Sequence, residues 1–547
     1  MERSRTEDII DRLKELKGAR SYMESYWQTL HDYFYIEADN VNRSYASGAE
    51  LNTDYLWDST TLEAADVLAS GFMNYLTPPS SKWFRLRHKD PSLADNKAVS
   101  DYLEKVADEV NYTLNRSNFY NQMFPAYKSS GVLGTSLLLE EEDLDDEARF
   151  INLPIKQVCI VEDARGRVCE YYIEFEYTAF QAATRWGKEK LSTEMQGEAE
   201  NRKDKKYPFL LFIAKRYRRD ITKEDKTNMP IEASWIDITN KTLIDESGYN
   251  EMPAMCHQFD KRPFIPWGFS PAMKALPFAR LLNAISKTNL RGMMKGTDPA
   301  VAVPDNAFIM PFNMNPRAVN YYKKDVMTGG GKDMFAIGNE GNPEIGLKAI
   351  EFYTQKVRSL MYYDVFLAFE GLEKQMNNPE VMERINEKMS MLGPAVGRYT
   401  TQVLNPIIIR TIGILWRRGK LPDPPDEILQ DPTYEIDFVG QLAQAQKRSE
   451  LNSLVTSLQM VGQMATFAPQ ILDKVDVDKA ADEVWSITGA PVRVLRDDAE
   501  IQSIREKRSQ ENAQAQEMAM FGAVAKTGKD AAQADKNMAE AKMAGMK

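Results

Sequence analysis

Two long helical patterns enclose an irregular insert in the middle of the chain. In the first pattern, apolar side chains recur at i, i+3, i+4 and i+7, which places them on one face of a helix (Phe278, Leu281, Leu282 and Ile285). A stretch rich in proline and glycine follows, and the second pattern extends from about Leu347 to Phe369. This order predicts two helices that form a stalk, with the insert as a small head.

The remaining sequence predicts a chain of the α+β class that is mainly helical. Residues 5–37, 59–76 and 99–131 carry apolar side chains at helical spacing. Between Thr135 and Phe259 the pattern changes to short runs rich in Val, Ile, Tyr and Phe, which predict strands at 136–139, 150–153, 157–161, 168–177, 209–216 and 234–238. Helical patterns return after the stalk and extend to about Arg508. The Ala-rich residues 511–547 are either mobile or a helix that needs neighbours.

The composition is that of a folded, acidic protein. Of the 547 residues, 43% are hydrophobic, and 69 Lys and Arg stand against 80 Asp and Glu, for a net charge of −11. Proteins that bind DNA tightly through its phosphates usually carry an excess of positive charge, so the composition argues against a tight DNA-binding function for this chain. Three cysteines without a CxxC pair argue against a disulfide framework or a zinc cage and indicate reduced thiols (Cys159, Cys169 and Cys256).

No segment has the pattern of a leader or a membrane anchor. The first residues are charged and no apolar run follows them, so we expect the protein to stay inside the cell that makes it. The most apolar helical stretch, residues 403–416, is interrupted by Arg410 and is shorter than the roughly 20 residues that a membrane span needs. The sequence therefore predicts no contact with a membrane.

Residues that could carry catalysis or hold a cofactor are not grouped in the sequence. The three histidines, His31, His88 and His257, lie far apart without metal-ligand spacing, so each is interpreted as a surface or satisfied core side chain. The run Gly329-Gly330-Gly331-Lys332 lacks the earlier glycine of a phosphate-binding loop, because position 326 is Val. We therefore expect no catalytic residues, no metal site, no cofactor and no enzymatic activity.

Three charged runs leave alternatives open. Residues 140–147 hold seven carboxylates in eight positions, which fits either a solvated loop between two strands or a cation site, although the spacing of an EF-hand is absent. The basic runs 215–219 and 416–420 could contact phosphates or the carboxylates of a partner. They could equally be a solvated strand end and a helix C-terminus, where positive charge is favoured by the helix dipole.

Several motifs follow one another in a fixed order. They are residues 68–86 (LASGFMNYLTPPSSKWFRL), the Gly-Thr pair at 134–135, residues 268–277, and residues 380–394 with continuations at 404–410, 418–422 and 441–447. Together they resemble the head-to-tail connector (portal) proteins of short-tailed bacteriophages, over roughly residues 5–450. The positions that carry the likeness are Gly71, Pro78, Pro79, Trp83, Phe84, Gly134, Pro271, Leu276, Pro277, Glu380, Arg384, Glu387, Lys388, Gly393, Pro394, Pro406, Gly419 and Pro422.

The resemblance implies a portal fold. Its parts would be a wing (1–271, N-terminal helices and β-rich domain), a first stem helix (272–296), a clip (297–346), a second stem helix (347–371), a tunnel loop (372–378), wing helices that return from the channel (379–430), a helical crown (431–510) and a tail that is a barrel extension or disordered (511–547). Trp57 and Trp83 could lie in the core or in a subunit interface.

The resemblance also implies a function. Family members form a homododecameric ring at a unique capsid vertex, through which double-stranded DNA is packaged and ejected. The implied partners are further copies of the chain, the DNA, the terminase packaging motor at the clip, the major capsid and scaffolding proteins, and tail or adaptor proteins. The implied location is the virion, and the host cytoplasm during assembly. The alternative is another virion structural protein, of the tail or the internal core, which would lack the stalk and head.

The loop expected nearest the DNA comprises Glu373, Lys374, Gln375, Met376, Asn377 and Asn378. Many relatives carry a threonine-rich stretch where this chain has Asn377-Asn378-Pro379. Twelve copies with a net charge of −11 each would repel DNA overall. We therefore expect acidic and neutral side chains to dominate the channel, with a few cations such as Lys374 that add weak friction.

Overall fold

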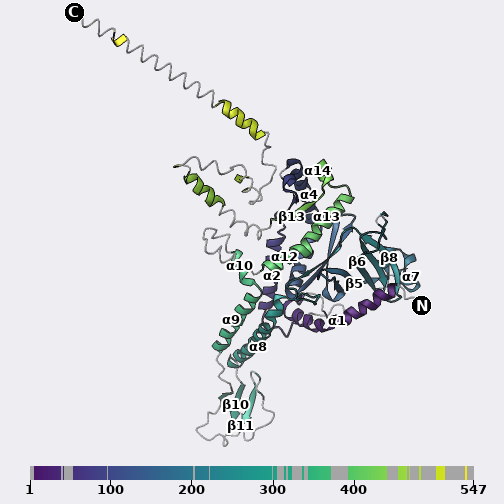
Figure 1. Cartoon of the computed structure of the whole chain (residues 1–547). Helices are drawn as coiled ribbons and strands as arrows, with labels where there is room; N and C mark the ends of the chain where they lie inside the picture. Colours follow the sequence, from purple (N-terminus) through teal and green to yellow (C-terminus); the bar gives the residue numbers. More distant parts are fainter. Residues whose placement is uncertain are drawn as a thin grey trace, which may run out of the picture. The chain divides into compact units, whose positions relative to one another are not determined.

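A computed structural model gives the fold (Figure 1). It describes residues 5–37, 41, 53–94, 96–200, 204–220, 222–223, 225–297, 300–304, 313, 315, 318–322, 335–337, 343–370, 392–439, 454–464, 467, 480–481, 484, 500–511 and 536–538. The chain divides into two compact units. The first comprises Met1–Leu86, Lys105–Asp423 and Ile436–Val455, and the second comprises Arg87–Glu104, Pro424–Glu435 and Thr456–Lys547.

Helices and strands confirm the α+β class. The helices are α1 (Arg5–Phe34), α2 (Thr60–Leu76), α3 (Pro91–Ala94), α4 (Lys97–Arg116), α5 (Phe119–Leu133), α6 (Ala179–Trp186), α7 (Thr193–Glu200), α8 (Pro271–Thr297), α9 (Pro343–Leu360), α10 (Tyr363–Glu370), α12 (Gly393–Tyr399), α13 (Asn405–Arg417) and α14 (Asp426–Gln430). The strands are β1 (Phe84–His88), β2 (Thr135–Asp143), β3 (Glu147–Leu153), β4 (Val158–Glu162), β5 (Val168–Thr178), β6 (Lys206–Lys215), β7 (Ile231–Asp237), β8 (Thr242–Tyr249), β9 (Ala254–Gln258), β10 (Ala300–Pro304), β11 (Val319–Tyr322), β12 (Phe335–Ile337) and β13 (Tyr434–Phe438).

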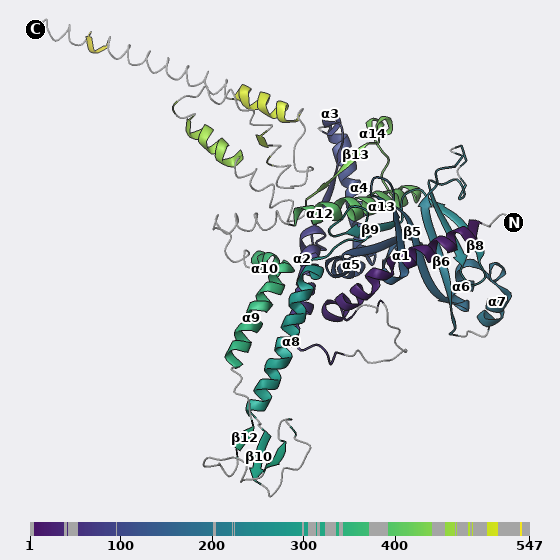
Figure 2. The ribbon, with the colours of Figure 1, turned by 60° about the horizontal axis from the view of Figure 1, so that its bottom comes forward.

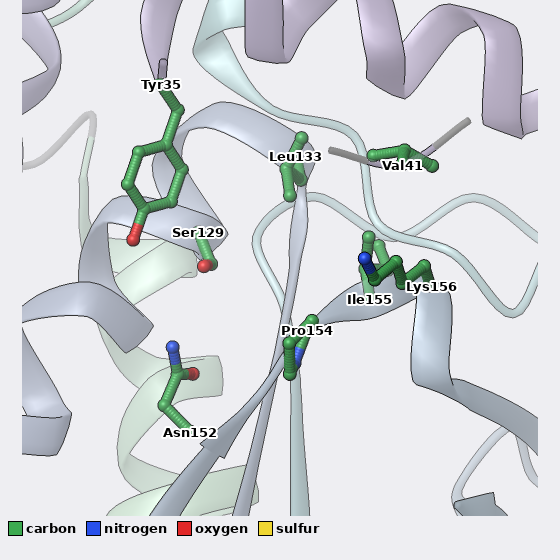
Figure 3. Close-up of a pocket in the computed structure, with 8 residues that line it drawn as sticks. All are labelled: Tyr35, Val41, Ser129, Leu133, Asn152, Pro154, Ile155 and Lys156. Carbon is green, nitrogen blue, oxygen red and sulfur yellow. The ribbon is translucent and has the colours of Figure 1, made fainter. Parts of the chain in front are cut away.

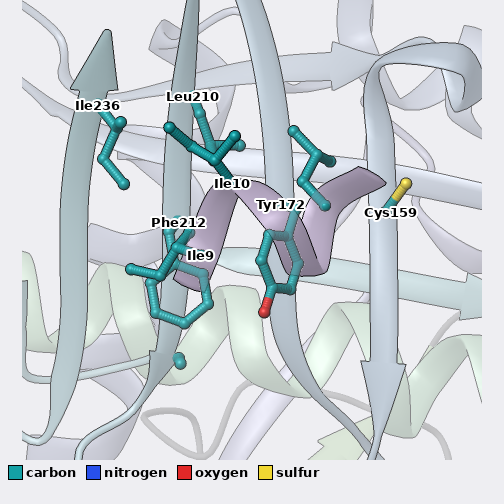
Figure 4. Close-up of a cluster of buried hydrophobic side chains, with 9 residues drawn as sticks. Ile9, Ile10, Cys159, Tyr172, Leu210, Phe212 and Ile236 are labelled. Atoms are coloured by element: carbon teal, nitrogen blue, oxygen red, sulfur yellow. The ribbon is translucent and has the colours of Figure 1, made fainter. Parts of the chain in front are cut away.

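A five-stranded antiparallel sheet forms the larger β layer, in the order β4-β5-β6-β7-β8. The first turns of α1 lie on one face of this sheet, where Ile9 and Ile10 pack against Tyr172, Leu210 and Phe212 (Figure 4). Burial of these apolar side chains holds the N-terminal helix on strands that lie more than 150 residues further along the chain.

A three-stranded sheet, β3-β2-β9, packs against α5. The sequence predicted one helical region that ends near Gly131, but the structure has two helices, and the second continues to Leu133. Gly134 then ends α5 with a left-handed φ of 84°, which glycine adopts without steric cost. The chain enters β2 directly from this cap.

The two predicted stalk helices are present as α8 and α9, which pack side by side (Figure 2). The insert between them contains a small sheet in the order β11-β10-β12, in which β10 pairs parallel with β11 and antiparallel with β12. The second helix is not continuous to Phe369 as predicted. It breaks after Leu360, because Tyr362 takes a left-handed φ of 59°, and resumes as α10.

The region that the sequence predicted to be a helical crown begins with a strand. Residues 434–438 form β13, which pairs with β1. In the first unit, the Val439 amide donates to the Trp83 carbonyl over 2.9 Å, and the rings of Trp83 and Phe438 stack with centroids 6.1 Å apart. Strand pairing and aromatic packing therefore override the expected helix at this point. Helical segments at 454–464 and 500–511 are described further along.

The second unit contains α3, α14 and the first part of α4. Here His88 is buried, accepts a hydrogen bond from the Asp90 amide at Nδ1, and lies 3.0 Å from the Asp431 carbonyl through Nε2. The neutral imidazole satisfies both contacts, so this histidine links β1 to the segment after α14.

Candidate functional site

The residues predicted to lie nearest DNA, 373–378, are outside the described part of the chain, as are Glu380, Arg384, Glu387 and Lys388. What the structure describes is the framework on either side. On one side α10 ends at Glu370, and on the other side α12 begins at Gly393. The remaining motif positions can be placed in this framework.

Gly71 lies where α2 meets α10. A β-carbon built at this glycine would be 2.2 Å from Cδ1 of Phe366, so no larger residue fits without displacing the ring. Phe366 also packs beside Phe72 and stacks on Tyr75, with centroids 5.8 and 5.9 Å away. The motif glycine therefore allows α10 to approach α2 closely.

Two motifs that lie far apart in the sequence meet at Gly134 and Gly268. A β-carbon at Gly134 would be 2.2 Å from the Gly268 carbonyl oxygen, and one at Gly268 would be 2.1 Å from that of Gly134. The Gly268 amide donates to the Thr135 hydroxyl over 2.9 Å, and the Ser270 hydroxyl donates to the Val132 carbonyl over 2.6 Å. This junction joins the end of α5 to the start of α8.

The motif prolines of α8 have a structural explanation. Pro271 is the first residue of the helix, where its missing N–H costs nothing. Pro277 lies inside the helix and leaves the Met273 carbonyl without its usual donor. The Tyr26 hydroxyl of α1 donates to that oxygen over 3.3 Å. Leu276 is buried beside them, so this end of the stalk is anchored on α1.

Pro78 and Pro79 follow α2, and the chain then enters β1 through Trp83 and Phe84, which are both fully buried. The Trp83 ring packs edge-on to Phe84 and stacks on Phe119, and its Nε1 donates to the Tyr120 hydroxyl over 3.3 Å. Trp83 is thus a core side chain within its own subunit, whereas Trp57 is 37% exposed.

The acidic run 140–147 is a solvated loop between two strands only at its centre, where Glu142, Asp145 and Asp146 are exposed. It forms the end of β2, a tight turn and the start of β3, and both Glu140 and Glu147 are buried. Glu140 accepts a hydrogen bond from Thr411 of α13 over 3.0 Å, and burial raises its pKa to about 8. The burial of these two carboxylates has a tertiary cause, since their partners Thr411 and Lys420 lie 271 and 273 residues further along the chain.

Arg410 explains how α13 docks on this hairpin. Its side chain has no exposed surface, and it donates to the carbonyls of Glu140 and Glu251, each over 3.1 Å. The guanidinium also lies 4.8 Å from the centroid of the Tyr249 ring. An arginine in the middle of the apolar stretch 403–416 was the signal in the sequence that could have found this contact.

The basic run 416–420 pairs with carboxylates of its own chain. Arg417 bonds to Glu251 over 2.8 Å and to Glu142 over 3.1 Å, and Lys420 bonds to Glu147. Gly419 ends α13 with a left-handed φ of 64°, and Pro422 follows it. In the other basic run, Arg216 pairs with Glu246 over 2.9 Å, while Tyr217 is 83% exposed.

A π-helical turn, Thr400–Leu404, connects α12 to α13. Pro406 has no N–H, so it cannot donate the usual helical hydrogen bond to the carbonyl four residues earlier. In the wider π-helical turn the Asn405 amide donates to the Thr400 carbonyl, five residues earlier. Gly393 and Pro394 begin α12. The segment before them, residues 371–391, is outside the described part of the chain.

Catalytic groups are not assembled in the described part of the chain. No three His, Cys, Asp or Glu side chains there lie close enough to hold a metal ion. Burial lowers the pKa of His257 to about 3 and so keeps that ring neutral. No helix among these residues has the length and apolar character of a membrane span.

One pocket, with a volume of about 120 Å³, lies beside the end of α1 (Figure 3). It is lined by Tyr35, Val41, Ser129, Leu133, Asn152, Pro154, Ile155 and Lys156. Burial raises the pKa of Tyr35 to about 12, so its hydroxyl stays protonated at neutral pH. The lining holds neither an acid–base pair nor an activated nucleophile.

Helix α8 is basic along its length. It carries Lys274, Arg280, Lys287, Arg291 and Lys295, and its sequence contains no Asp or Glu. Arg280, Arg291 and Lys295 are exposed. The exposed face of α8 is therefore positively charged, although the net charge of the whole chain is −11.

The family model described as "Bacteriophage head to tail connecting protein" matches residues 6–495. The chain belongs to this family. The resemblance found in the sequence, and with it the role of head-to-tail connector (portal) protein of a tailed phage, is thereby confirmed.

Two curated proteins resemble this connector over nearly their whole length. The chain is 30% identical over 536 residues to "Portal protein" of Salmonella phage epsilon15, which covers 97% of this chain and 96% of that protein. It is 28% identical over 525 residues to "Probable portal protein" of Bordetella phage BPP-1, with 95% and 94% covered.

A solved structure, "Virion of native gene transfer agent (GTA) particle", matches this connector with a TM-score of 0.33 and 12% identity, over 73% of this chain and 86% of that one. A score at this level carries no argument about the fold.

Proposed function

We propose that twelve copies of this connector form a ring at one vertex of the capsid, and that double-stranded DNA passes through the ring during packaging and ejection. The observation that carries the proposal is the family match over residues 6–495. The paired helices α8 and α9, with the small β10–β12 sheet between them in sequence, give each copy an elongated element suited to a channel wall.

The deciding experiment measures the assembly. Twelve chains of 62.4 kDa have a mass of about 749 kDa, which light scattering resolves from a monomer. Negative-stain electron microscopy of the same sample should show rings with a central hole. Rings of thirteen copies would also support the proposal, whereas filaments or closed dimers would favour a different virion component.

The loop at residues 372–378 is proposed to contact the DNA. Deletion of residues 372–377 should leave ring assembly intact and impair DNA packaging or retention. A deletion variant that packages and retains DNA as well as the intact protein would refute this role of the loop.

The remaining partners follow from the same proposal. The packaging motor would dock on the segment that contains the β10–β12 sheet, and the major capsid, scaffolding and tail or adaptor proteins would bind elsewhere on the ring. Assembly would take place in the host cytoplasm. Co-purification of the terminase with the intact ring, and its loss when residues 300–337 are replaced by a short linker, would test the first of these contacts.

Catalysis is no part of the proposal, because the DNA would be driven by the separate motor. An ATPase assay of the purified ring checks this statement. Turnover well above that of a heat-inactivated sample would contradict a purely structural role.

A further inference from the structure

A corner in the backbone connects α9 to α10. Tyr362 has a φ of 59°, a left-handed conformation that is rare for an aromatic residue and costs about 1–3 kcal/mol. The amides of Val365 and Phe366 bond to the Tyr362 carbonyl, so α10 starts directly at the corner. Such a conformation persists only where surrounding contacts hold it.

The carboxylate of Glu63, on α2, contacts both sides of this corner. Arg358, in the last turn of α9, donates to Oε2 over 3.0 Å, and the Tyr363 hydroxyl, at the start of α10, donates to Oε1. The Arg358 guanidinium lies 4.7 Å from the centroid of the Tyr363 ring, so the two donors also touch each other. One side chain from a third helix therefore ties the two helices together.

The charge on Glu63 is stabilised by these contacts. The hydrogen bond from Tyr363, followed by the bond and charge of Arg358, lowers the pKa of the carboxyl below its usual range. The carboxylate thus remains ionised at neutral pH, where both donors can use it. One turn further along α10, Phe366 is packed against Gly71, so the direction of α10 is set at two points along α2.

Helix α10 ends at Glu370, two residues before the segment 372–378. We propose that Glu63 is a positioning residue for the channel loop: by bridging Arg358 and Tyr363 it fixes the direction of α10, and so the point from which the loop leaves the framework. This proposal rests on the proposed role of residues 372–378.

The test compares two substitutions on α2. Glu63→Ala removes the bridge, while Asp66→Ala is the matched control, because Asp66 lies one turn away, is equally exposed, and pairs with Lys128 of α5. Hydrogen–deuterium exchange of assembled rings reports on both. In Glu63→Ala, amides 363–370 should exchange about tenfold faster, as expected when a hydrogen bond to a charged group is lost, with α8 and the ring mass unchanged. Unchanged exchange in α10, or equal acceleration in Asp66→Ala, would overturn the proposal.

A second variant separates positioning from general loosening. Tyr363→Phe removes one donor, so it should accelerate exchange in α10 when Glu63 is present and add nothing in the Glu63→Ala background. Additive effects would show that the residues act independently, and would overturn the bridge.

Retention of DNA in assembled particles then connects the bridge to the loop. Glu63→Ala should retain less DNA than Asp66→Ala. If retention is equal while deletion of residues 372–377 impairs it, the positioning role fails and the role of the loop stands. If the deletion also has no effect, the proposed function of the loop fails, while the exchange data still decide whether Glu63 holds α10.

Discussion

Gly71 and Phe366 are in such close contact that a single added methyl group would overlap the phenylalanine ring, at 2.2 Å from Cδ1. Gly71 comes from α2 and Phe366 from α10, so their contact joins the N-terminal helices to the segment that precedes the predicted channel loop. A residue larger than glycine at position 71 would therefore displace the Phe366 ring.

Gly71→Ala should displace Phe366 and destabilise the protein by about 1–3 kcal/mol, the usual cost of overpacking a core. The midpoint of thermal unfolding of the purified protein measures it. Gly18→Ala is the control, since no atom lies within 4 Å of a β-carbon there. Alanine at that exposed position in α1 should be neutral or stabilise by about 0.5–1 kcal/mol. Equal effects of the two substitutions would contradict the close packing at Gly71.

Gly134→Ala should be more harmful than Gly419→Ala. Both glycines have a left-handed φ, 84° and 64°, so both substitutions carry backbone strain of about 1 kcal/mol. Only at Gly134 would the new β-carbon also meet a backbone atom, the Gly268 oxygen at 2.2 Å, while nothing lies within 4 Å at Gly419. Soluble yield and unfolding midpoint of the two variants measure the difference, and comparable values would argue against the Gly134–Gly268 junction.

Glu140→Gln should change how stability depends on pH. The folded-state pKa of Glu140 is raised by burial to about 8, above its ordinary value of 4.5, so the folded protein holds a proton that the unfolded chain releases. This contribution is fully present below pH 4.5 and is lost as pH rises toward 8. The variant and the parent should unfold at similar temperatures at pH 5, and the variant at a higher temperature at pH 8.5. A difference that is the same at both pH values would show that Glu140 does not titrate in this range.

Arg410→Ala should cost about 1–3 kcal/mol for each backbone carbonyl, of Glu140 and of Glu251, that it leaves without a donor. Arg417→Ala, in the same helix, should cost only about 0–1 kcal/mol, since its side chain is 30% exposed and its ion pairs are screened by water. Chemical denaturation of both variants gives the two values. A small loss for Arg410→Ala would mean that the hairpin and α13 separate without its help.

Periodicity in the sequence was sufficient to predict helix α8. Helix α8 contains the apolar positions 278–285 that predicted a helix, because its buried residues, its N-terminal proline and its neighbours all favour the same local structure. Strand β8 shows the opposite case. Its sequence, TLIDESGY, has little strand character, and it is a strand because β7 provides a partner edge.

The sequence by itself determined the family, the stalk with its insert, and the change from helical to β-rich pattern at Thr135, since each depends on residues that are close together in the chain. Only the tertiary structure decided how the acidic run 140–147 is buried, because Arg410, which bonds to the Glu140 carbonyl, lies 270 residues further along the chain. The same holds for the corner at Tyr362, because no local pattern favours its left-handed backbone. The carboxylate that bonds to the next residue, Tyr363, belongs to Glu63, which lies 300 residues earlier. Contacts between residues so far apart produce no periodic pattern in the sequence, so they can be identified only in the folded chain.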